Sequence, residues 1–209
     1  MKKLMTILCF AAYISTSQTL IAQNATSTLE SIPSDYITRS PIYDYSERQL
    51  NNTDSIPDFE TKPDKLKISG TIYQADGVTP AKNVVLYIYQ PDEHGNYNMK
   101  TLNQKRYVKD RAWIKTDANG NYTFYTFVPG RHHRGTEFKH ILSMVKEPGK
   151  AEYDIDSFLF DDDPLLTKIC RKRLAKKGMD NIILKLEKKD NMYVATRDIV
   201  LSSSAPDLK

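Results

Sequence analysis

Cysteine is scarce in this chain of 209 residues, which contains only Cys9 and Cys170. Cys9 lies in an apolar N-terminal segment that we expect to be removed, so the mature protein would keep Cys170 alone. A single cysteine excludes an intrachain disulfide. The fold must therefore be held by a hydrophobic core, which suits an exported domain of this size.

Long apolar runs are also absent. The longest, residues 4–14, is shorter than the about 20 residues that a membrane-spanning helix needs. It follows Lys2 and Lys3 and precedes a small residue, Ala22, which is the pattern of a secretory signal. We therefore expect residues 1–22 to be a signal peptide cleaved after Ala22. The mature protein would be secreted or periplasmic, without membrane insertion.

The chain lacks a strong excess of charge of one sign. It carries 30 Lys and Arg against 26 Asp and Glu, a net charge of +4. Loss of Lys2 and Lys3 with the signal peptide reduces this charge to +2. Such a near-neutral balance gives no reason to expect a nucleic acid or an anionic membrane as partner. The sequence also lacks a P-loop, a dinucleotide-binding fingerprint, paired CxxC motifs and a nucleophile-elbow serine.

The rest of the sequence divides into a polar arm, one domain and a short tail. Residues 23–64 are polar and show no sustained apolar period. Residues 65–201 carry dense β signals between turn residues, and residues 202–209 are expected to be a flexible tail. Within the domain we expect strands at residues 66–72, 84–89, 121–127, 140–145, 181–186 and 192–201. Short strands at this spacing predict an all-β fold, an antiparallel β-sandwich.

One segment departs from the strand pattern. Leu165, Ile169 and Leu174 recur at helical spacing and Gly178 follows as a C-cap, so residues 164–177 predict one short helix in the C-terminal region. Lysines and arginines surround these residues. They favour a solvated helix face over the alternative of a polyanion-binding site.

Several motifs follow one another along the domain. The turn at residues 94–97 ends in Tyr97, residues 116–124 read TDxxGxYxF, and Pro129 and Gly130 are followed ten residues later by His140. Residues 160–165 read FDDDPL. Together these motifs resemble the intradiol ring-cleavage dioxygenases over residues 36–201, whereas transthyretin-like sandwiches share only the TDxxGxY and Pro-Gly parts. That resemblance implies a β-sandwich enzyme that opens catechol rings with a non-haem Fe(III) held by two tyrosines and two histidines.

The resemblance also implies a ligand set. Tyr97 falls on the first tyrosine ligand and His140 on the first histidine ligand. His132 stands where the family has its second tyrosine, with His133 beside it as a further donor. Leu142 stands at the second histidine, on the same strand face as His140 because strand side chains alternate. Histidine in place of a phenolate removes a negative charge, so beside the Fe(III) that the resemblance implies, a softer divalent metal such as zinc or copper, or no metal, is an alternative.

The positions that would meet the substrate differ from the family pattern as well. Glu137 stands where the family has an arginine, which reverses the charge, and Ser157 stands where it has a glutamine. Arg131 and Arg134 are the cations close enough in sequence to substitute for that arginine. Tyr97 and Arg131 are therefore the predicted catalytic residues.

Three functions are compatible with these residues. The first is an exported, metal-dependent intradiol dioxygenase for a small catechol-like aromatic, with a degenerate iron site. The alternative is a non-catalytic sandwich that binds a small ligand, a glycan or a surface partner, and the third is a transthyretin-type accessory domain without a pocket. Four aromatic residues are expected in the core and its rim, or else along a cleft: Tyr87, Tyr89, Tyr107 and Trp113. The substrate, the metal and the oligomeric state, monomer or oligomer, stay open at this point.

Overall fold

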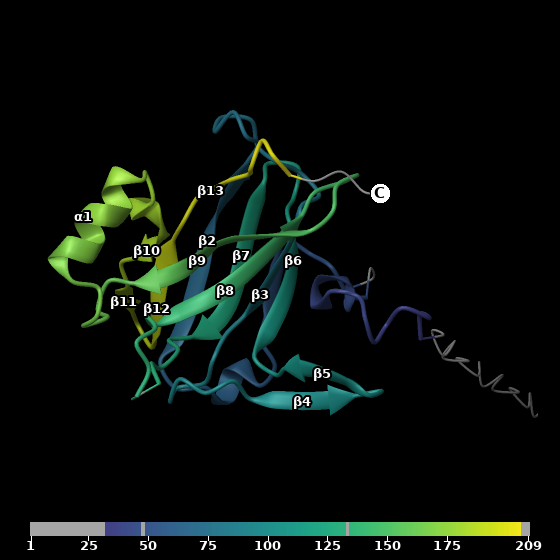
Figure 1. The fold of residues 1–209 in the computed structure, drawn as a ribbon, viewed down its shortest axis with the longest axis horizontal. Helices are drawn as coiled ribbons and strands as arrows, with labels where there is room; N and C mark the ends of the chain where they lie inside the picture. Colours follow the sequence, from purple (N-terminus) through teal and green to yellow (C-terminus); the bar gives the residue numbers. More distant parts are fainter. Residues whose placement is uncertain (1–31, 47–48, 133, 206–209) are drawn as a thin grey trace, which may run out of the picture. The chain divides into compact units, whose positions relative to one another are not determined.

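The strands form two packed sheets and a separate hairpin (Figure 1). The computed structural model describes residues 32–46, 49–132 and 134–205, and every element named below lies in the unit that begins at Ser34. Within these residues, the first sheet has six strands, ordered β1-β7-β2-β12-β11 with β13 beside β2, and the second has five, ordered β10-β9-β8-β3-β6. The predicted signal peptide lies outside the described residues.

The bounds of the strands are as follows. The first sheet contains β1 (Thr53–Ser55), β2 (Lys65–Tyr73), β7 (Asn121–Phe127), β11 (Glu187–Lys189), β12 (Met192–Thr196) and β13 (Ile199–Val200). The second contains β3 (Val85–Tyr89), β6 (Arg111–Lys115), β8 (His140–Lys146), β9 (Tyr153–Phe160) and β10 (Ile183–Leu184). The hairpin consists of β4 (Met99–Leu102) and β5 (Lys105–Val108).

The all-β sandwich predicted from the sequence is confirmed, with one correction to its strand directions. The central pairs β2–β7, β3–β6, β3–β8 and β8–β9 are antiparallel as expected. The pairs β1–β7, β9–β10, β2–β12 and β2–β13 are parallel. Parallel neighbours need long connections, and the chain between these strands is long enough to supply them. The sheets are therefore mixed at their margins.

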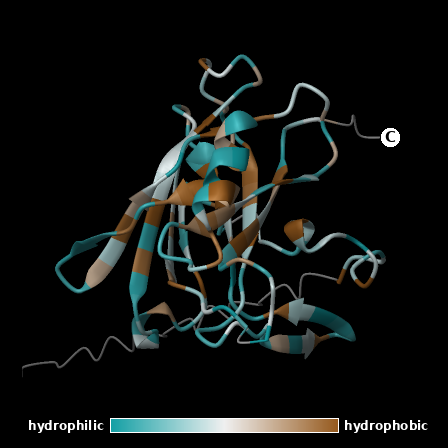
Figure 2. Ribbon diagram, turned by 60° about the vertical axis from the view of Figure 1, so that its left-hand side comes forward, coloured by the Kyte–Doolittle hydropathy of each residue, from teal (hydrophilic) through white to brown (hydrophobic). Residues whose placement is uncertain are grey.

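The core lies between the inner faces of the two sheets. Side chains alternate along each strand, so Leu86 and Ile88 of β3 and Ile141 of β8 point inward and are fully buried. Phe124 of the first sheet meets Phe158 of the second edge to face, with ring centroids 5.6 Å apart. Each such buried side chain contributes about 1.5–3 kcal/mol to folding. Figure 2 shows the resulting alternation of hydrophobic and hydrophilic residues along the strands.

The polar arm covers part of the outer face of the second sheet. Ile42, in the short helix η1 (Pro41–Tyr43), is fully buried and packs with Val85 and Tyr87 of β3. The indole nitrogen of Trp113 on β6 donates a hydrogen bond to the carbonyl of Pro41 at 3.0 Å. The arm therefore protects one half of that face from water, and the other half remains open.

Two further contacts join the arm to the rest of the fold. Asp44 forms ion pairs with Lys105 of β5 at 2.6 Å and with Arg39 at 2.8 Å. Strand β1 also belongs to residues 23–64, and it pairs with Thr123–Tyr125 of β7. It escapes sequence prediction because three polar residues, Thr-Asp-Ser, show no apolar alternation. The short helix η2 (Phe59–Thr61) follows and leads into β2.

The hairpin β4–β5 extends the end of the second sheet at which β3 terminates (Figure 1). Its two-residue turn, Asn103 and Gln104, has positive φ at both positions, 47° and 67°. Turns of that kind match the right-handed twist of paired strands, so the hairpin is a tight ribbon. Its first strand is exposed along its whole length.

The predicted C-terminal helix is present as α1 (Lys168–Lys176), with the Thr167 hydroxyl accepting a hydrogen bond from the Cys170 amide at its N-terminus. Leu174 and Cys170 pack on a small cluster around Leu166, whereas Ile169 is 66% exposed. The expectation that Ile169 belongs to the apolar face is wrong, since the helix turns Cys170 inward instead. The expected strand 181–186 is split into η3 (Asp180–Ile182) and β10. No helix within the described residues is long and apolar enough to cross a membrane.

Candidate functional site

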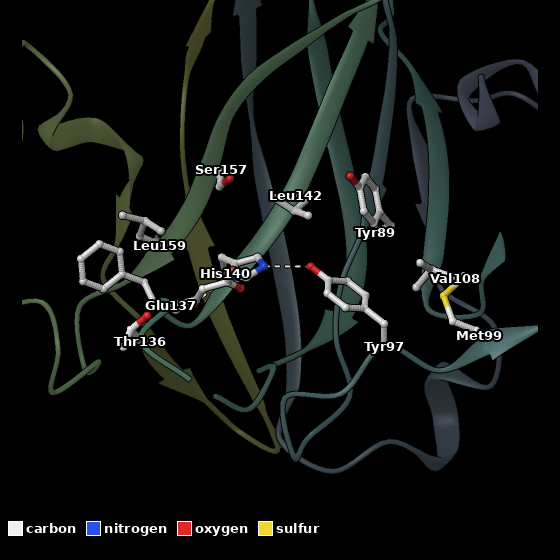
Figure 3. A pocket seen from close by; sticks show the side chains of 11 residues that line it. Tyr89, Tyr97, Met99, Val108, Thr136, Glu137, His140, Leu142, Ser157 and Leu159 are labelled. Carbon is white, nitrogen blue, oxygen red and sulfur yellow. Dashed lines mark hydrogen bonds between the residues drawn. The ribbon is translucent and has the colours of Figure 1, made fainter. Parts of the chain in front are cut away.

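A cavity of about 750 Å³ lies on the open half of the outer face of the second sheet. The strands β3, β8 and β9 form its floor, and the hairpin and the loop before β8 form its sides. Strand alternation explains its composition, because the side chains that do not enter the core point into it. It is lined by Tyr89, Tyr97, Met99, Val108, Thr136, Glu137, Phe138, His140, Leu142, Ser157 and Leu159 (Figure 3).

Two of the predicted site residues meet in this cavity. The hydroxyl of Tyr97 lies 2.8 Å from Nε2 of His140, and Figure 3 shows the two side chains pointing toward each other. Nδ1 of His140 lies 2.6 Å from the carbonyl oxygen of Phe138. A carbonyl only accepts, so Nδ1 carries a proton, and in the neutral imidazole Nε2 accepts the proton of the tyrosine hydroxyl. The pair is therefore an oriented donor–acceptor unit.

The surroundings of Tyr97 favour its neutral form. Burial raises the pKa of its phenol to about 12, and the neighbouring Tyr89 and the carboxylate of Glu137 act in the same direction. A phenolate ligand to a metal needs the opposite shift, which a strongly charged cation or a nearby basic residue provides. These surroundings by themselves therefore favour the phenol over the phenolate.

The remaining ligand positions of the resemblance do not complete a metal site. The side chain of Leu142 lies in the cavity beside His140, as the alternation of β8 predicted, and it offers no donor atom. Across the described residues, no group of three or more His, Cys, Asp and Glu side chains is arranged to hold a metal ion. The residues present thus do not fit the two-tyrosine, two-histidine set that Fe(III) has in the resembling family. The predicted metal ligand His133 lies outside the described residues.

The loop that carries His132 lines a second, smaller cavity of about 400 Å³, which adjoins the first. This cavity shares Tyr97, Glu137 and His140 with the first and adds Arg131, His132 and Arg134. His132 is exposed, and Arg131 donates a hydrogen bond to the carbonyl of Gly135 at 3.1 Å. The predicted residues are therefore neighbours, but the two arginines face the second cavity and not the first.

Backbone contacts hold the two site loops against each other. Gly95 has φ of +83°, and a Cβ placed on it would lie 2.1 Å from the backbone nitrogen of His132. A Cβ on Gly130 would lie 2.2 Å from the carbonyl oxygen of Glu93. Only glycine permits such an approach, so the turn that carries Tyr97 and the loop that carries His132 are locked together.

A series of aromatic rings runs from the arm into the cavity. Trp113, Tyr87 and Tyr89 follow at centroid distances of 5.2 and 5.4 Å, and Tyr97 and His140 continue the series at 6.4 Å each. Tyr87 is 2% exposed beneath the arm, whereas Tyr89 lines the cavity. Tyr87 thus packs in the interior, which was one of the two expected placements, and Tyr89 lines a cleft, which was the other.

Several cavity residues gave no sequence signal of function. Met99 and Val108 come from the hairpin, and Thr136 and Phe138 from the loop before β8. None of these side chains carries reactive chemistry, and their meeting depends on the tertiary arrangement of the hairpin. No period-two pattern in β9 could have placed Leu159 on the outer face beside Ser157, because residues 158–160 are all apolar and the pairing of β8 with β9 contains a register shift.

Comparison with known proteins rests on structure alone. No protein-family model matches the chain, and no curated protein matches it in sequence. The dioxygenase domain of a dioxygenase–carbohydrate-binding fusion from Streptomyces sp. SirexAA-E matches 78% of this chain over 99% of its own, with 21% identity and a TM-score of 0.55. An intradiol ring-cleavage dioxygenase from Tetranychus urticae matches 77% of this chain over 90% of its own, with 18% identity and a TM-score of 0.53.

A third match is to a dioxygenase whose name gives its substrate. Hydroxyquinol 1,2-dioxygenase from Pseudomonas putida DLL-E4 matches 75% of this chain over 62% of its own, with 17% identity and a TM-score of 0.51. Identities of this size establish the fold and leave the chemistry to the site residues. The chain has the fold of the intradiol ring-cleavage dioxygenases, as its motifs predicted.

Proposed function

We propose that the protein is exported and binds a small phenolic or catechol-type molecule in the cavity beside Tyr97 and His140, without opening its ring. The observation that carries this proposal is the hydrogen bond from the Tyr97 hydroxyl to Nε2 of His140 at the wall of a largely apolar cavity. The bond leaves the lone pairs of the tyrosine oxygen available to a ligand hydroxyl. Apolar walls with a few oriented polar groups are the usual composition of a small-molecule site.

The walls suit a planar ring. Tyr89, Met99, Leu142 and Leu159 provide aromatic and aliphatic surface around the hydrogen-bonding pair. Burying apolar surface contributes roughly 25 cal/mol per Å², and the loss of ligand freedom on binding offsets much of that gain. We therefore expect dissociation constants of about 0.01–1 mM for simple phenols and catechols.

Binding without ring opening follows from the side chains that replace the family's ligands. Leu142 fills a donor position, and Glu137 puts a negative charge where an arginine is expected. Metal-dependent ring cleavage is the alternative function. One observation favours it: the hydrogen bond of Nδ1 to the Phe138 carbonyl fixes His140 in the tautomer that metal-binding histidines adopt.

Calorimetry and oxygen uptake distinguish the two functions. We expect catechol and phenol to bind the purified protein, and we expect no oxygen consumption with catechol, with or without added iron salts. Tyr97→Phe should weaken phenol binding, whereas Tyr107→Phe, on the hairpin and outside the cavity lining, should not. Oxygen uptake that disappears in Tyr97→Phe would establish the enzyme instead. Absence of binding by any phenol or catechol would refute the proposal.

Export is tested separately. Residues 1–22 have the basic, apolar and small-residue order of a signal peptide. We expect full-length protein expressed in a Gram-negative host to be recovered outside the cytoplasm, with a mass that begins at Gln23. A cytoplasmic product that retains Met1 would contradict export while leaving the binding proposal intact.

A further inference from the structure

We propose that the cavity selects aromatic ligands that carry a positive charge, such as an ammonium group on a short side chain, through the carboxylate of Glu137. This inference rests on the proposed function and adds the class of ligand. It depends on the charge of the cavity lining. The lining has no lysine or arginine, whereas that of the adjoining cavity includes Arg131 and Arg134.

The lining of the larger cavity contains one charged side chain. Its eleven residues include no lysine and no arginine, and Glu137 is the only carboxylate among them. His140 adds no charge when its Nε2 accepts the proton of the Tyr97 hydroxyl, as in the neutral imidazole. A cavity whose one charged side chain is a carboxylate favours a ligand of opposite charge.

Glu137 is available for such a ligand. Its side chain is exposed and lines the cavity. The nearby Arg131 donates to the backbone carbonyl of Gly135 instead of meeting this carboxylate. Glu137 also contributes to the raised pKa of Tyr97, so the field of the carboxylate reaches the hydrogen-bonding pair inside the cavity.

The aromatic rings of the cavity act in the same direction. Tyr89, Tyr97 and Phe138 line it, and ring faces attract ammonium groups within about 6 Å of their centroids. Glu137 and Phe138 come just before β8, at the start of which His140 lies. A ligand whose ring contacts Tyr97 and Leu142 therefore meets the carboxylate and a ring face at its charged end.

The adjoining cavity offers the opposite chemistry and defines the competing outcome. Arg131, His132 and Arg134 line it, and it shares Glu137 and Tyr97 with the larger cavity. If a ligand carboxylate reached these arginines, the protein would prefer anionic phenols. The affinities of two phenols, one with an ammonium group and one with a carboxylate, therefore show which cavity determines the choice of ligand. Tighter binding of the ammonium form indicates the larger cavity, and tighter binding of the carboxylate form indicates the adjoining one.

Three phenols of similar size provide the test: tyramine, which is cationic, para-ethylphenol, which is neutral, and para-hydroxyphenylpropionate, which is anionic. By calorimetry we expect tyramine to bind about five- to tenfold more tightly than para-ethylphenol at low salt, and the anion to bind most weakly. The preference should shrink at high salt, because screening weakens exposed charge pairs. Glu137→Gln should remove the preference of tyramine over para-ethylphenol, and Glu137→Arg should reverse it.

A matched control is Glu187→Gln, which removes an exposed glutamate from β11 of the other sheet and should leave all three affinities unchanged. Equal binding of tyramine and para-ethylphenol, or tighter binding of the anion, overturns the inference and leaves the proposed function standing. Failure of all three phenols to bind overturns both. A tyramine preference that survives in Glu137→Gln also overturns the role given to this carboxylate.

Discussion

Nε2 of His140 lies 2.8 Å from the hydroxyl of Tyr97, and this contact joins the start of β8 to the turn that precedes β4. The two residues are 43 positions apart in sequence. The hydrogen bond therefore fixes both the geometry of the cavity wall and the direction in which the tyrosine proton points.

Removal of this hydrogen bond should affect binding more than folding. Tyr97→Phe keeps the ring and deletes the hydroxyl, so we expect a loss of about 0.5–1.5 kcal/mol in the free energy of unfolding. Affinity for phenols should fall by up to about tenfold, the equivalent of one hydrogen bond. Urea unfolding and calorimetry measure the two effects. A loss of stability well above this range would show that Tyr97 is mainly a structural residue.

The tyrosines make the stability of the protein depend on alkaline pH. Burial raises the pKa of Tyr97 to about 12, and burial also raises those of Tyr43 and Tyr153 to about 12. An unfolded tyrosine titrates near 10, so between about pH 10 and pH 12 the unfolded chain releases protons that the folded chain keeps. The free energy of unfolding should therefore fall with rising pH in that window. Below it, these tyrosines are protonated in both states and should cause no change of stability with pH.

A spectrophotometric titration of tyrosinate absorbance checks this prediction. Tyr97→Phe should remove one ionisation from the late part of the curve and leave the early part unchanged. A Tyr97 phenol that titrates near 10 would mean that the cavity is more hydrated than its walls indicate.

Leu142→His should create a metal site that the described part of the chain lacks. Residues 140 and 142 lie on one face of β8 and both line the cavity, so two imidazoles would converge beside Tyr97. We expect cobalt or zinc affinity to rise by about tenfold or more, the scale of effect that a partner group has on metal binding. The visible spectrum of the cobalt form measures it. Leu142→Gln is the matched control, since it adds polarity without an imidazole.

The arm should be held mainly by Ile42. Ile42→Ala removes a fully buried side chain and should cost about 2–5 kcal/mol of stability. Trp113, the single tryptophan, lies beneath the arm and should become more hydrated, with a red-shifted fluorescence emission. Ile37→Ala is the control, because that side chain is 57% exposed and its loss should change stability by less than about 0.5 kcal/mol. Equal effects of the two substitutions would contradict this account.

Strands β2, β3, β7 and β8 could be predicted because their residues follow the physics of strands, whereas β4, β5, β6 and β9 lie outside every predicted segment. Residues 121–127 alternate without interruption, and β7 has those bounds; β2, β3 and β8 differ from their predicted bounds by one residue at each end at most. The marginal strands could not be predicted in the same way. β1 is three polar residues and β10 only two, and both exist because a neighbouring strand offers unpaired backbone groups.

The candidate site was predictable in its donors and not in its walls. Motif order places Tyr97 and His140 together, and alternation in β8 places Leu142 beside His140, as the structure has them. The metal-binding and catalytic roles given to Tyr97, Arg131, His132 and His140 stay predictions. Met99 and Val108 could not be foreseen, because their place depends on where the hairpin lies rather than on any local pattern.

The close approach of Gly95 to the backbone of residues 131 and 132 positions the loop through its main chain. The place of the side chain at position 132 then depends little on which amino acid stands there. The backbones of the two loops are in close contact at Gly95, so we expect a substitution at position 132 to exchange one functional group for another with little displacement of the loop. The scaffold can thus gain or lose a chemistry by single substitutions while its architecture stays unchanged. For protein engineering, the glycines should be kept fixed and positions 132, 137 and 142 varied.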